Sequence, residues 1–184
     1  MTDRLGPLPF EQLSAAQREA ARELIEGPRG ALYGPFVPLL RSPQLMATAQ
    51  RMGEYLRYRG AIGARLTELA ILLTARQWNQ QVEWAVHAPL AAANGIPQDC
   101  IDAIAARRRP TGMAADEALV HDFCLELQQR RSVSDATYAH ALALFGEQGV
   151  VDLAGLIGYY TLLAMVMNTA QTAVPPSGAA PLPE

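Results

Sequence analysis

The segment 79–91, with the sequence NQQVEWAVHAPLA, carries an amide, a carboxylate and an imidazole at Gln80, Glu83 and His87. Residues three and four apart lie on one face of a helix, so these side chains are expected to line up about one turn apart. A carboxylate beside an imidazole raises the basicity of the ring, which makes His87 a candidate general base. The alternative is an exposed helix pair that only adds a little stability.

The apolar neighbours of this polar stripe favour a buried site, because buried polar groups need hydrogen-bond partners. These neighbours are Val82, Trp84, Ala85, Val86 and Ala88. Glu68 is a second carboxylate in an apolar setting, RLTELAILL, although a first-turn acid at a helix N-terminus is the simpler interpretation. A metal held by Glu68, Glu83 and His87 is conceivable. The paired Glu-x-x-His segments of di-iron bundles are absent, so no metal or other cofactor is expected.

Other candidates for chemistry are weaker. His121, which precedes Asp122, and His140 lie on helices of ordinary amphipathic character and are expected at the surface. Tyr159 and Tyr160 are expected in the core, although a tyrosine hydroxyl near a site could donate a hydrogen bond. The sequence contains no GxSxG, P-loop, GxGxxG or HExxH pattern, which excludes the common nucleotide-binding and hydrolase classes.

Length and composition indicate one domain, 1–184, that associates with copies of itself. A chain of 184 residues suits a single core. Hydrophobic residues make up 50% and charged residues 18%, which is more apolar surface than a monomer needs to bury. A net charge of −3 argues against nucleic acid or an anionic membrane as a partner, since both require a basic face. A small-molecule substrate is the expected partner.

The N-terminal sequence and the cysteines point to the cytoplasm. The start, MTDRLGPLPFEQLS, has no apolar run after a basic stretch, so no signal peptide is expected. The longest apolar stretch, 153–167, is shorter than the roughly 20 residues of a membrane span and is interpreted as a buried helix. Cys100 and Cys124 form neither a CxxC pair nor a zinc pattern, which is typical of free thiols in a cytoplasmic protein.

Apolar residues recur at spacings of three and four nearly throughout, without the alternation of strands, and predict an all-α fold. Caps and breakers place about seven to eight helices, at 15–26, 43–59, 64–78, 80–94, 97–107, 114–131, 135–146 and 151–170. Pro89 is expected to kink the fourth. The stretch 27–41 is expected to be an apolar loop, and 173–184 a loose tail. Arg107, Arg108 and Arg109 suit the negative end of a helix, and we interpret them as a solvated cap rather than an anion site.

The run 65–104 resembles the core of the carboxymuconolactone decarboxylase family, within the alkyl hydroperoxidase D-like superfamily, and the resemblance extends over about 27–168. The hydroperoxidase branch has a glutamate, eleven residues, a CxxC pair and a histidine four residues further on. Glu68 falls at the glutamate, and His87 falls at the histidine. Gln80 and Glu83 replace the two cysteines, so peroxide reduction through a disulfide is chemically impossible at these positions.

The resemblance to the decarboxylase branch implies a cofactor-free lyase or isomerase that acts on a small carboxylated metabolite, a lactone or an aromatic-derived acid. His87 would be its acid or base, Glu83 a partner or second proton donor, and Glu68 the residue that orients His87. The substrate-binding residues would be Gln80, Arg29, Arg65, Trp84 and Tyr160, with one of the two arginines on the substrate carboxylate. The family fold implies an all-α bundle that forms trimers or hexamers.

Two alternatives stay open. One is a peroxidase-related family member without thiol peroxidase chemistry, or with residual redox character through Cys100 or Cys124. The other is a non-catalytic, ligand-binding oligomer in which Glu83 and His87 only satisfy each other. An enzyme is expected if His87 lines a pocket that Glu68 and Gln80 face, and the structural role is expected if the polar stripe is dry and closed.

Overall fold

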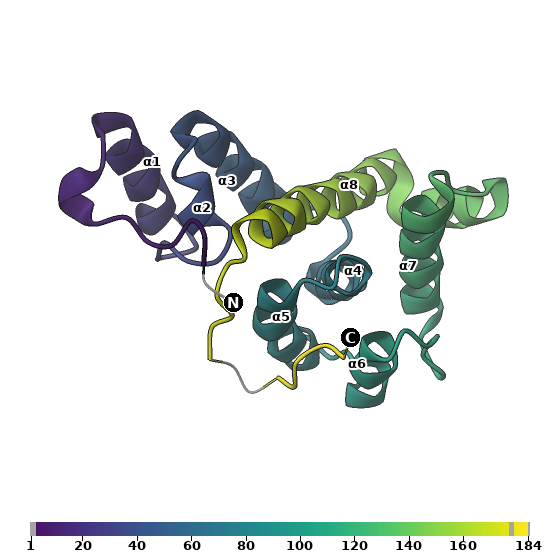
Figure 1. Cartoon of the computed structure of the whole chain (residues 1–184). Helices are drawn as coiled ribbons and strands as arrows, with labels where there is room; N and C mark the ends of the chain where they lie inside the picture. Colours follow the sequence, from purple (N-terminus) through teal and green to yellow (C-terminus); the bar gives the residue numbers. More distant parts are fainter. Residues whose placement is uncertain (1–2, 177–178, 184) are drawn as a thin grey trace.

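The computed structural model describes residues 3–176 and 179–183, and within them every regular element is helical (Figure 1). In chain order the elements are a 3-10 turn (Phe10–Gln12), α1 (Ala15–Glu26), α2 (Phe36–Leu39), α3 (Pro43–Tyr58), α4 (Ala64–Gln77), α5 (Gln81–Ala93), α6 (Gln98–Ala105), α7 (Ala115–Leu125), a π-helical turn (Glu126–Arg130) and α8 (Asp135–Ala170). This confirms the all-α bundle and the number of helices expected from the sequence.

Local capping signals place several helix ends where the sequence predicts them. At the start of α1, Ser14 and Gln17 form a reciprocal capping box, in which each side chain binds the other residue's backbone N–H. Ser134 accepts the backbone N–H of Thr137 at the start of α8. Asn79 takes a left-handed φ of 49° and separates α4 from α5.

The structure adds detail at three of the predicted boundaries. The loop 27–41 contains the short helix α2. Pro89 lies inside α5 without ending it; proline removes one backbone hydrogen bond, and the burial of the apolar side chains around it offsets that loss. The two helices expected at 135–146 and 151–170 both form within α8, and the chain is kinked between them at Gly146, whose φ of 66° is not helical.

Helix α4 is the centre of the fold. It packs against α5, α6, α7, α8 and the end of α3, and Figure 1 shows it enclosed between α5, α7 and α8. All residues from 66 to 76 are buried, which explains why this helix is apolar on every side. Two charged residues, Glu68 and Arg76, are therefore carried into the interior, where a charge needs a partner.

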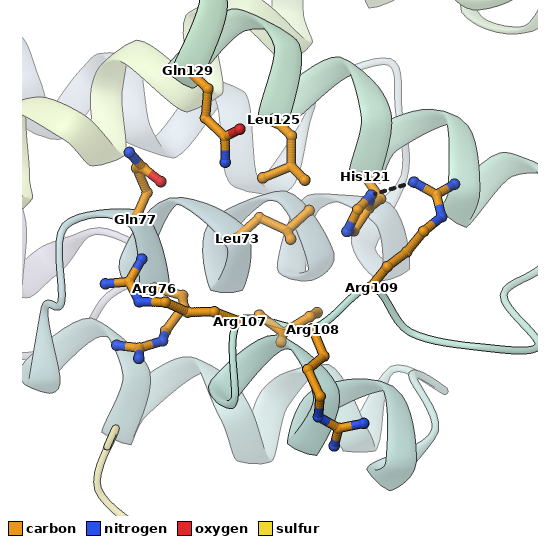
Figure 2. A pocket seen from close by; sticks show the side chains of 10 residues that line it. Leu73, Arg76, Gln77, Arg107, Arg108, Arg109, His121, Leu125 and Gln129 are labelled. Atoms are coloured by element: carbon orange, nitrogen blue, oxygen red, sulfur yellow. Dashed lines mark hydrogen bonds between the residues drawn. The ribbon is translucent and has the colours of Figure 1, made fainter. Parts of the chain in front are cut away.

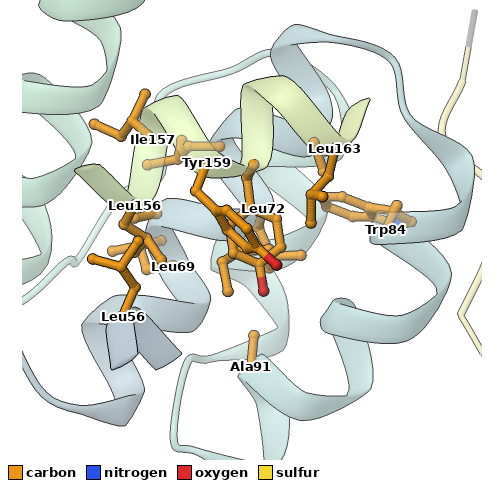
Figure 3. Packing of buried hydrophobic residues seen from close by; sticks show 14 of the residues in the cluster. Leu56, Leu69, Leu72, Trp84, Ala91, Leu156, Ile157, Tyr159 and Leu163 are labelled. Atoms are coloured by element: carbon orange, nitrogen blue, oxygen red, sulfur yellow. The ribbon is translucent and has the colours of Figure 1, made fainter. Parts of the chain in front are cut away.

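The core that surrounds α4 comes from helices distant in the sequence. Figure 3 shows it with Leu56 from α3, Leu69 and Leu72 from α4, Trp84 and Ala91 from α5, and Leu156, Ile157, Tyr159 and Leu163 from α8. On the other side of α8, α1 packs on α3, and the short α2 contacts both α3 and α8. This packing brings α3 and the segment before α2 close to the buried faces of α5 and α8.

The C-terminal segment, expected to be a loose tail, lies against α5 in its described part. Leu182 is buried, its backbone N–H donates to Gln81 Oε1 at 2.9 Å, and its carbonyl accepts from Gln81 Nε2 at 3.0 Å. Gln81 thus binds both backbone groups of Leu182, a contact that no composition signal in the tail predicts.

One helix of the described chain, α8, is long and apolar enough to cross a membrane. Half of its most apolar stretch is buried inside the protein, and the core helix of a globular protein meets the same criterion. The burial of Leu153, Leu156 and Leu163 accounts for the apolar character of α8.

Candidate functional site

Glu68, Glu83 and His87 meet in the interior, where α4 faces α5. His87 Nδ1 lies 2.6 Å from Glu68 Oε2, and its Nε2 lies 3.3 Å from Glu83 Oε2. All three side chains are nearly inaccessible to solvent. Because α5 is helical, Glu83 reaches His87 from one turn away, whereas Glu68 arrives through helix packing. The ring therefore has a carboxylate at each nitrogen.

Two further side chains complete this cluster. The Tyr160 hydroxyl of α8 lies 3.4 Å from His87 Nε2, and the two rings meet edge to face with centroids 5.3 Å apart. Arg57, at the end of α3, places Nη2 3.4 Å from Glu68 Oε1 and is mostly buried. Sequence reasoning missed Arg57, because an arginine in the last turn of a helix normally lies in solvent as a partner of the dipole.

The pKa shifts of His87 and Glu68 favour their charged forms, whereas that of Tyr160 favours its neutral form. Burial by itself lowers the pKa of His87, but its hydrogen bonds to Glu68 and Glu83 raise it above the ordinary value. Burial raises the pKa of Glu68, and the contacts with His87 and Arg57 outweigh that effect and lower it. Burial also raises the pKa of Tyr160 well above 10, so its hydroxyl stays protonated. The shifts of His87 and Glu68 therefore both favour an ion pair between the imidazole and the carboxylate.

His87, Glu83 and Tyr160 line a cavity of about 20 Å³, together with the segment 33–36. A cavity of this size holds about one water molecule. Arg29 and Arg57 line it as well, and three of the side-chain atoms around it are buried without a hydrogen-bond partner: Arg29 Nε, Arg57 Nε and Glu83 Oε1. Unpartnered buried polar atoms are rare, so their concentration at one cavity indicates a place where a polar group binds.

Of the residues expected to bind substrate, Arg29 and Tyr160 lie at this cavity. Arg29 Nη2 lies 3.3 Å from the Tyr159 hydroxyl, and its guanidinium stacks 4.7 Å above the Phe36 ring centre. Glu68 lies behind His87 rather than on the cavity wall. Its position suits a residue that orients the imidazole.

Three other expected residues are not brought to the cavity. Gln80 caps α5: its Oε1 accepts the backbone N–H groups of Val82 at 2.6 Å and Glu83 at 3.3 Å. Its Nε2 donates to Asn168 on α8, so both ends of the amide have structural partners. Residue 80 is the N-cap of α5 and precedes its first turn, so its spacing from Glu83 and His87 does not place it on their face of the helix.

Arg65 and Trp84 also lie elsewhere. Arg65 forms ion pairs with Asp116 and Glu117 at the start of α7. Trp84 lines a separate hollow between α5, α6 and the described residues 179–181 of the tail. The carboxylates of α7 hold Arg65 away from the cavity, which its sequence neighbours do not reveal.

Gly53 in α3 permits the close approach of two residues at the site. A Cβ at this position would lie 2.2 Å from the Tyr159 hydroxyl oxygen and 2.6 Å from Arg29 Nη2, far inside contact distance. Only a glycine allows α3 to pack at this depth. The sequence indicates this close packing through a glycine inside an otherwise regular helix. A glycine there lowers the stability of the helix by about 1 kcal/mol relative to alanine.

Neither thiol belongs to this cluster, and neither is poised to react. Burial raises the pKa of Cys100 to about 11, with a smaller contribution from the Glu117 carboxylate. Burial alone raises the pKa of Cys124 as well. Since the thiolate is the nucleophile, redox chemistry through these cysteines is disfavoured.

Within the described residues no group of three His, Cys, Asp or Glu side chains is arranged to hold a metal ion. At His87 the geometry explains this, because both ring nitrogens already face carboxylates.

The acid/base arrangement rests on Glu68, His87 and Glu83, and the resemblance to a decarboxylase family rests on the spacing of the same residues. No protein-family model matches the sequence, and no curated protein matches it either.

Proposed function

We propose that this protein is a cofactor-free acid/base enzyme of the carboxymuconolactone decarboxylase type, a lyase or isomerase for a small carboxylated metabolite. One observation carries the proposal: His87 has a carboxylate at each ring nitrogen and lines a cavity that also receives Arg29 and Arg57. A proton donor and acceptor beside two guanidinium groups suits a substrate that carries a carboxylate and must exchange a proton.

The charge balance of the cluster favours an anionic substrate. The two glutamates of the cluster face three basic side chains, His87, Arg29 and Arg57, so its basic groups exceed its acidic groups by one positive charge when all are ionised. One substrate carboxylate neutralises that charge. The unpartnered Nε groups of Arg29 and Arg57 are the donors that such a carboxylate would accept.

The proton steps follow from which groups line the cavity. In a lyase reaction the bond between the substrate's carboxyl carbon and its neighbour breaks, carbon dioxide leaves, and the remaining carbon takes the proton of His87 Nε2. In an isomerase reaction Glu83, whose Oε1 has no partner, takes a proton from one carbon, and His87 returns one to another. Glu68 stabilises the imidazolium through Nδ1 in both cases.

Access requires movement of the segment that covers the cavity. A space of about 20 Å³ admits a water but no metabolite. Residues 33–35 and Arg29 line the cavity outside the helices, and Gly34 holds a left-handed φ of 57° among them. We expect this segment to open for substrate and to close during the reaction, which would exclude water from the proton transfer.

The test is turnover by the full chain with small lactone carboxylates and β-keto acids, followed as carbon dioxide release and as loss of substrate. Replacing the acid/base group by His87→Asn should lower kcat/KM by about 100-fold or more. His140→Asn is the matched control, because His140 is an exposed histidine on α8. Equal turnover by wild type and His87→Asn with every accepted substrate would refute the proposed role.

A second candidate is a ligand-binding protein without catalysis, favoured by the closed cavity and by the mutual pairing of His87 and Glu83. It predicts that carboxylated ligands bind without being converted. Calorimetry on ligands that show no turnover separates the two candidates. Loss of binding in Arg29→Gln would then assign the cavity to a binding role.

We also propose that the chain forms a cytoplasmic homo-oligomer, a trimer or a hexamer. Composition supports association, and large apolar side chains lie exposed along α3, at Leu45, Met52 and Tyr55. Exposed apolar surface of this kind is common where subunits meet. Sedimentation equilibrium on the full chain gives the subunit number.

A further inference from the structure

A second cavity, of about 110 Å³, lies between α4, α7 and the connection from α6 to α7 (Figure 2). Its volume is several times that at His87 and well above the roughly 10 to 15 Å³ that a single water needs. Four arginines line it: Arg76 from α4, and Arg107, Arg108 and Arg109 from the connection. In a protein of net charge −3, this concentration of cations is a local reversal of charge.

Arg76 carries the least compensated charge at this cavity. The residue is only 5% exposed, its Nη1 donates to Asn79 Oδ1 at 2.5 Å, and its Nε is buried without a partner. Burial and the neighbouring cation of Arg107 lower the pKa of Arg76. No ion pair of Arg76 with a carboxylate occurs among the described residues. A buried cation of this kind costs free energy until an anion binds it.

Arg107 faces the same space. Its backbone holds a left-handed φ of 55°, and Figure 2 shows its side chain ending beside that of Arg76, whereas Arg108 points away. Within the described chain no side-chain hydrogen bond or ion pair of Arg107 is found. Arg109 differs, because it forms an ion pair with Asp122 of α7. Among the arginines whose side chains face the cavity, Arg76 and Arg107 are therefore the two for which the described residues supply no counter-charge.

At the edge of this cavity lies His121, which the sequence placed at the surface. It is buried, and its Nδ1 lies 3.2 Å from Arg109 Nη1 and 3.1 Å from Asp122 Oδ1. The contacts of Arg109 with Asp122 and His121 hold the arginine side chain in place on the His121 side of the cavity. The uncompensated charge is thus confined to the opposite side, at Arg76 and Arg107 (Figure 2).

We propose that this cavity binds a small oxyanion of the phosphate class, held between Arg76 and Arg107. Guanidinium groups match phosphate oxygens with paired hydrogen bonds, and a doubly charged anion neutralises two cations at once. The anion is either free inorganic phosphate or the phosphate group of a small metabolite. This site is separate from His87. It gives Arg107 a role in anion binding in addition to the solvated position after α6 that the sequence predicts for the triple arginine, whose three residues are exposed.

The experiment is isothermal titration of the full chain with inorganic phosphate and with glycerol phosphate, in chloride buffer of matched ionic strength. Arg107→Asn removes the accessible cation and keeps a residue that tolerates the left-handed backbone. Binding to wild type and an affinity about tenfold or more weaker in Arg107→Asn are expected. Tighter binding of glycerol phosphate would assign the site to a metabolite, and tighter binding of inorganic phosphate to the free ion; both support an oxyanion site.

Arg51→Gln is the matched control, because it also removes one positive charge, from an exposed pair with Glu23. Arg51 lies on α3, on the side of the molecule opposite to α6 and α7 (Figure 1). This variant should bind phosphate as wild type does. The proposal is overturned if wild type shows no phosphate binding at about ten millimolar, if both variants weaken it equally, or if acetate binds more tightly than phosphate.

Discussion

Glu68 and Arg76 lie about two turns apart on the buried helix α4, and their surroundings differ sharply. Glu68 meets the imidazole of His87 and the guanidinium of Arg57, so its charge is compensated from two other helices. Arg76 meets an amide oxygen and the cation Arg107, so its charge is not compensated within the described chain. A compensated charge is part of the folded structure, whereas an uncompensated one is a place for a ligand.

The strongest test of this contrast is Glu68→Gln. Removing the carboxylate leaves His87 and Arg57 as buried cations that have lost a partner, and the free energy of unfolding should fall by about 3 kcal/mol. Urea denaturation measures the change. Glu54→Gln breaks the more exposed pair with Arg59 and should cost less than about 1 kcal/mol. Similar losses of free energy in Glu68→Gln and Glu54→Gln would show that the buried carboxylate contributes no more to stability than the more exposed one.

Gly53→Ala tests the packing that positions Arg29. The added Cβ meets the Tyr159 hydroxyl and Arg29, and this overpacking should lower the free energy of unfolding by about 2 kcal/mol despite the better helix propensity. Gly158→Ala is the control, because nothing lies within 4 Å of its Cβ. That variant should instead be stabilised, by up to about 1 kcal/mol. Stabilisation of both would show that α3 does not approach the site so closely.

The pH dependence of stability probes the charge on His87. Because the folded pKa of His87 is raised, its contribution is complete below its ordinary value of 6.5 and is lost as the pH rises through the folded pKa. The stability difference between wild type and His87→Gln should therefore shrink with rising pH, by at most about 1.4 kcal/mol per pH unit. Thermal or urea unfolding from about pH 6 upward keeps Glu68 ionised. A difference that grows with pH would mean that the imidazole is neutral when folded.

The smallest effect is expected for Arg76→Met. Methionine fills much of the same volume and removes a buried cation that has no carboxylate partner, so the free energy of unfolding should change by less than about 1 kcal/mol. A loss as large as that in Glu68→Gln would show that the charge of Arg76 is compensated after all. Urea denaturation in phosphate-free buffer is the appropriate measurement, since a bound anion would stabilise the wild type.

The sequence predicts those contacts of the site that join residues one helical turn apart. The Glu83 to His87 pair follows from helical spacing, whereas the contact of Glu68 with His87 joins residues 19 apart in the sequence and depends on how α4 packs against α5. Arg57 was missed, because nothing around residue 57 distinguishes a buried guanidinium from a solvated one. Gln80 was assigned to substrate because spacing does not show whether a residue lies inside the first turn or caps it.

The sequence by itself determined the helices, the caps at Ser14 and Ser134, and the pairing of Glu83 with His87, since these depend on interactions between residues a few positions apart. The tertiary structure decided the rest: which carboxylate reaches His87 Nδ1, the size of the cavity beside it, and the meeting of Arg76 with Arg107. Each of these depends on the angle and depth at which separate helices pack, and that geometry is set by the whole core rather than by local spacing.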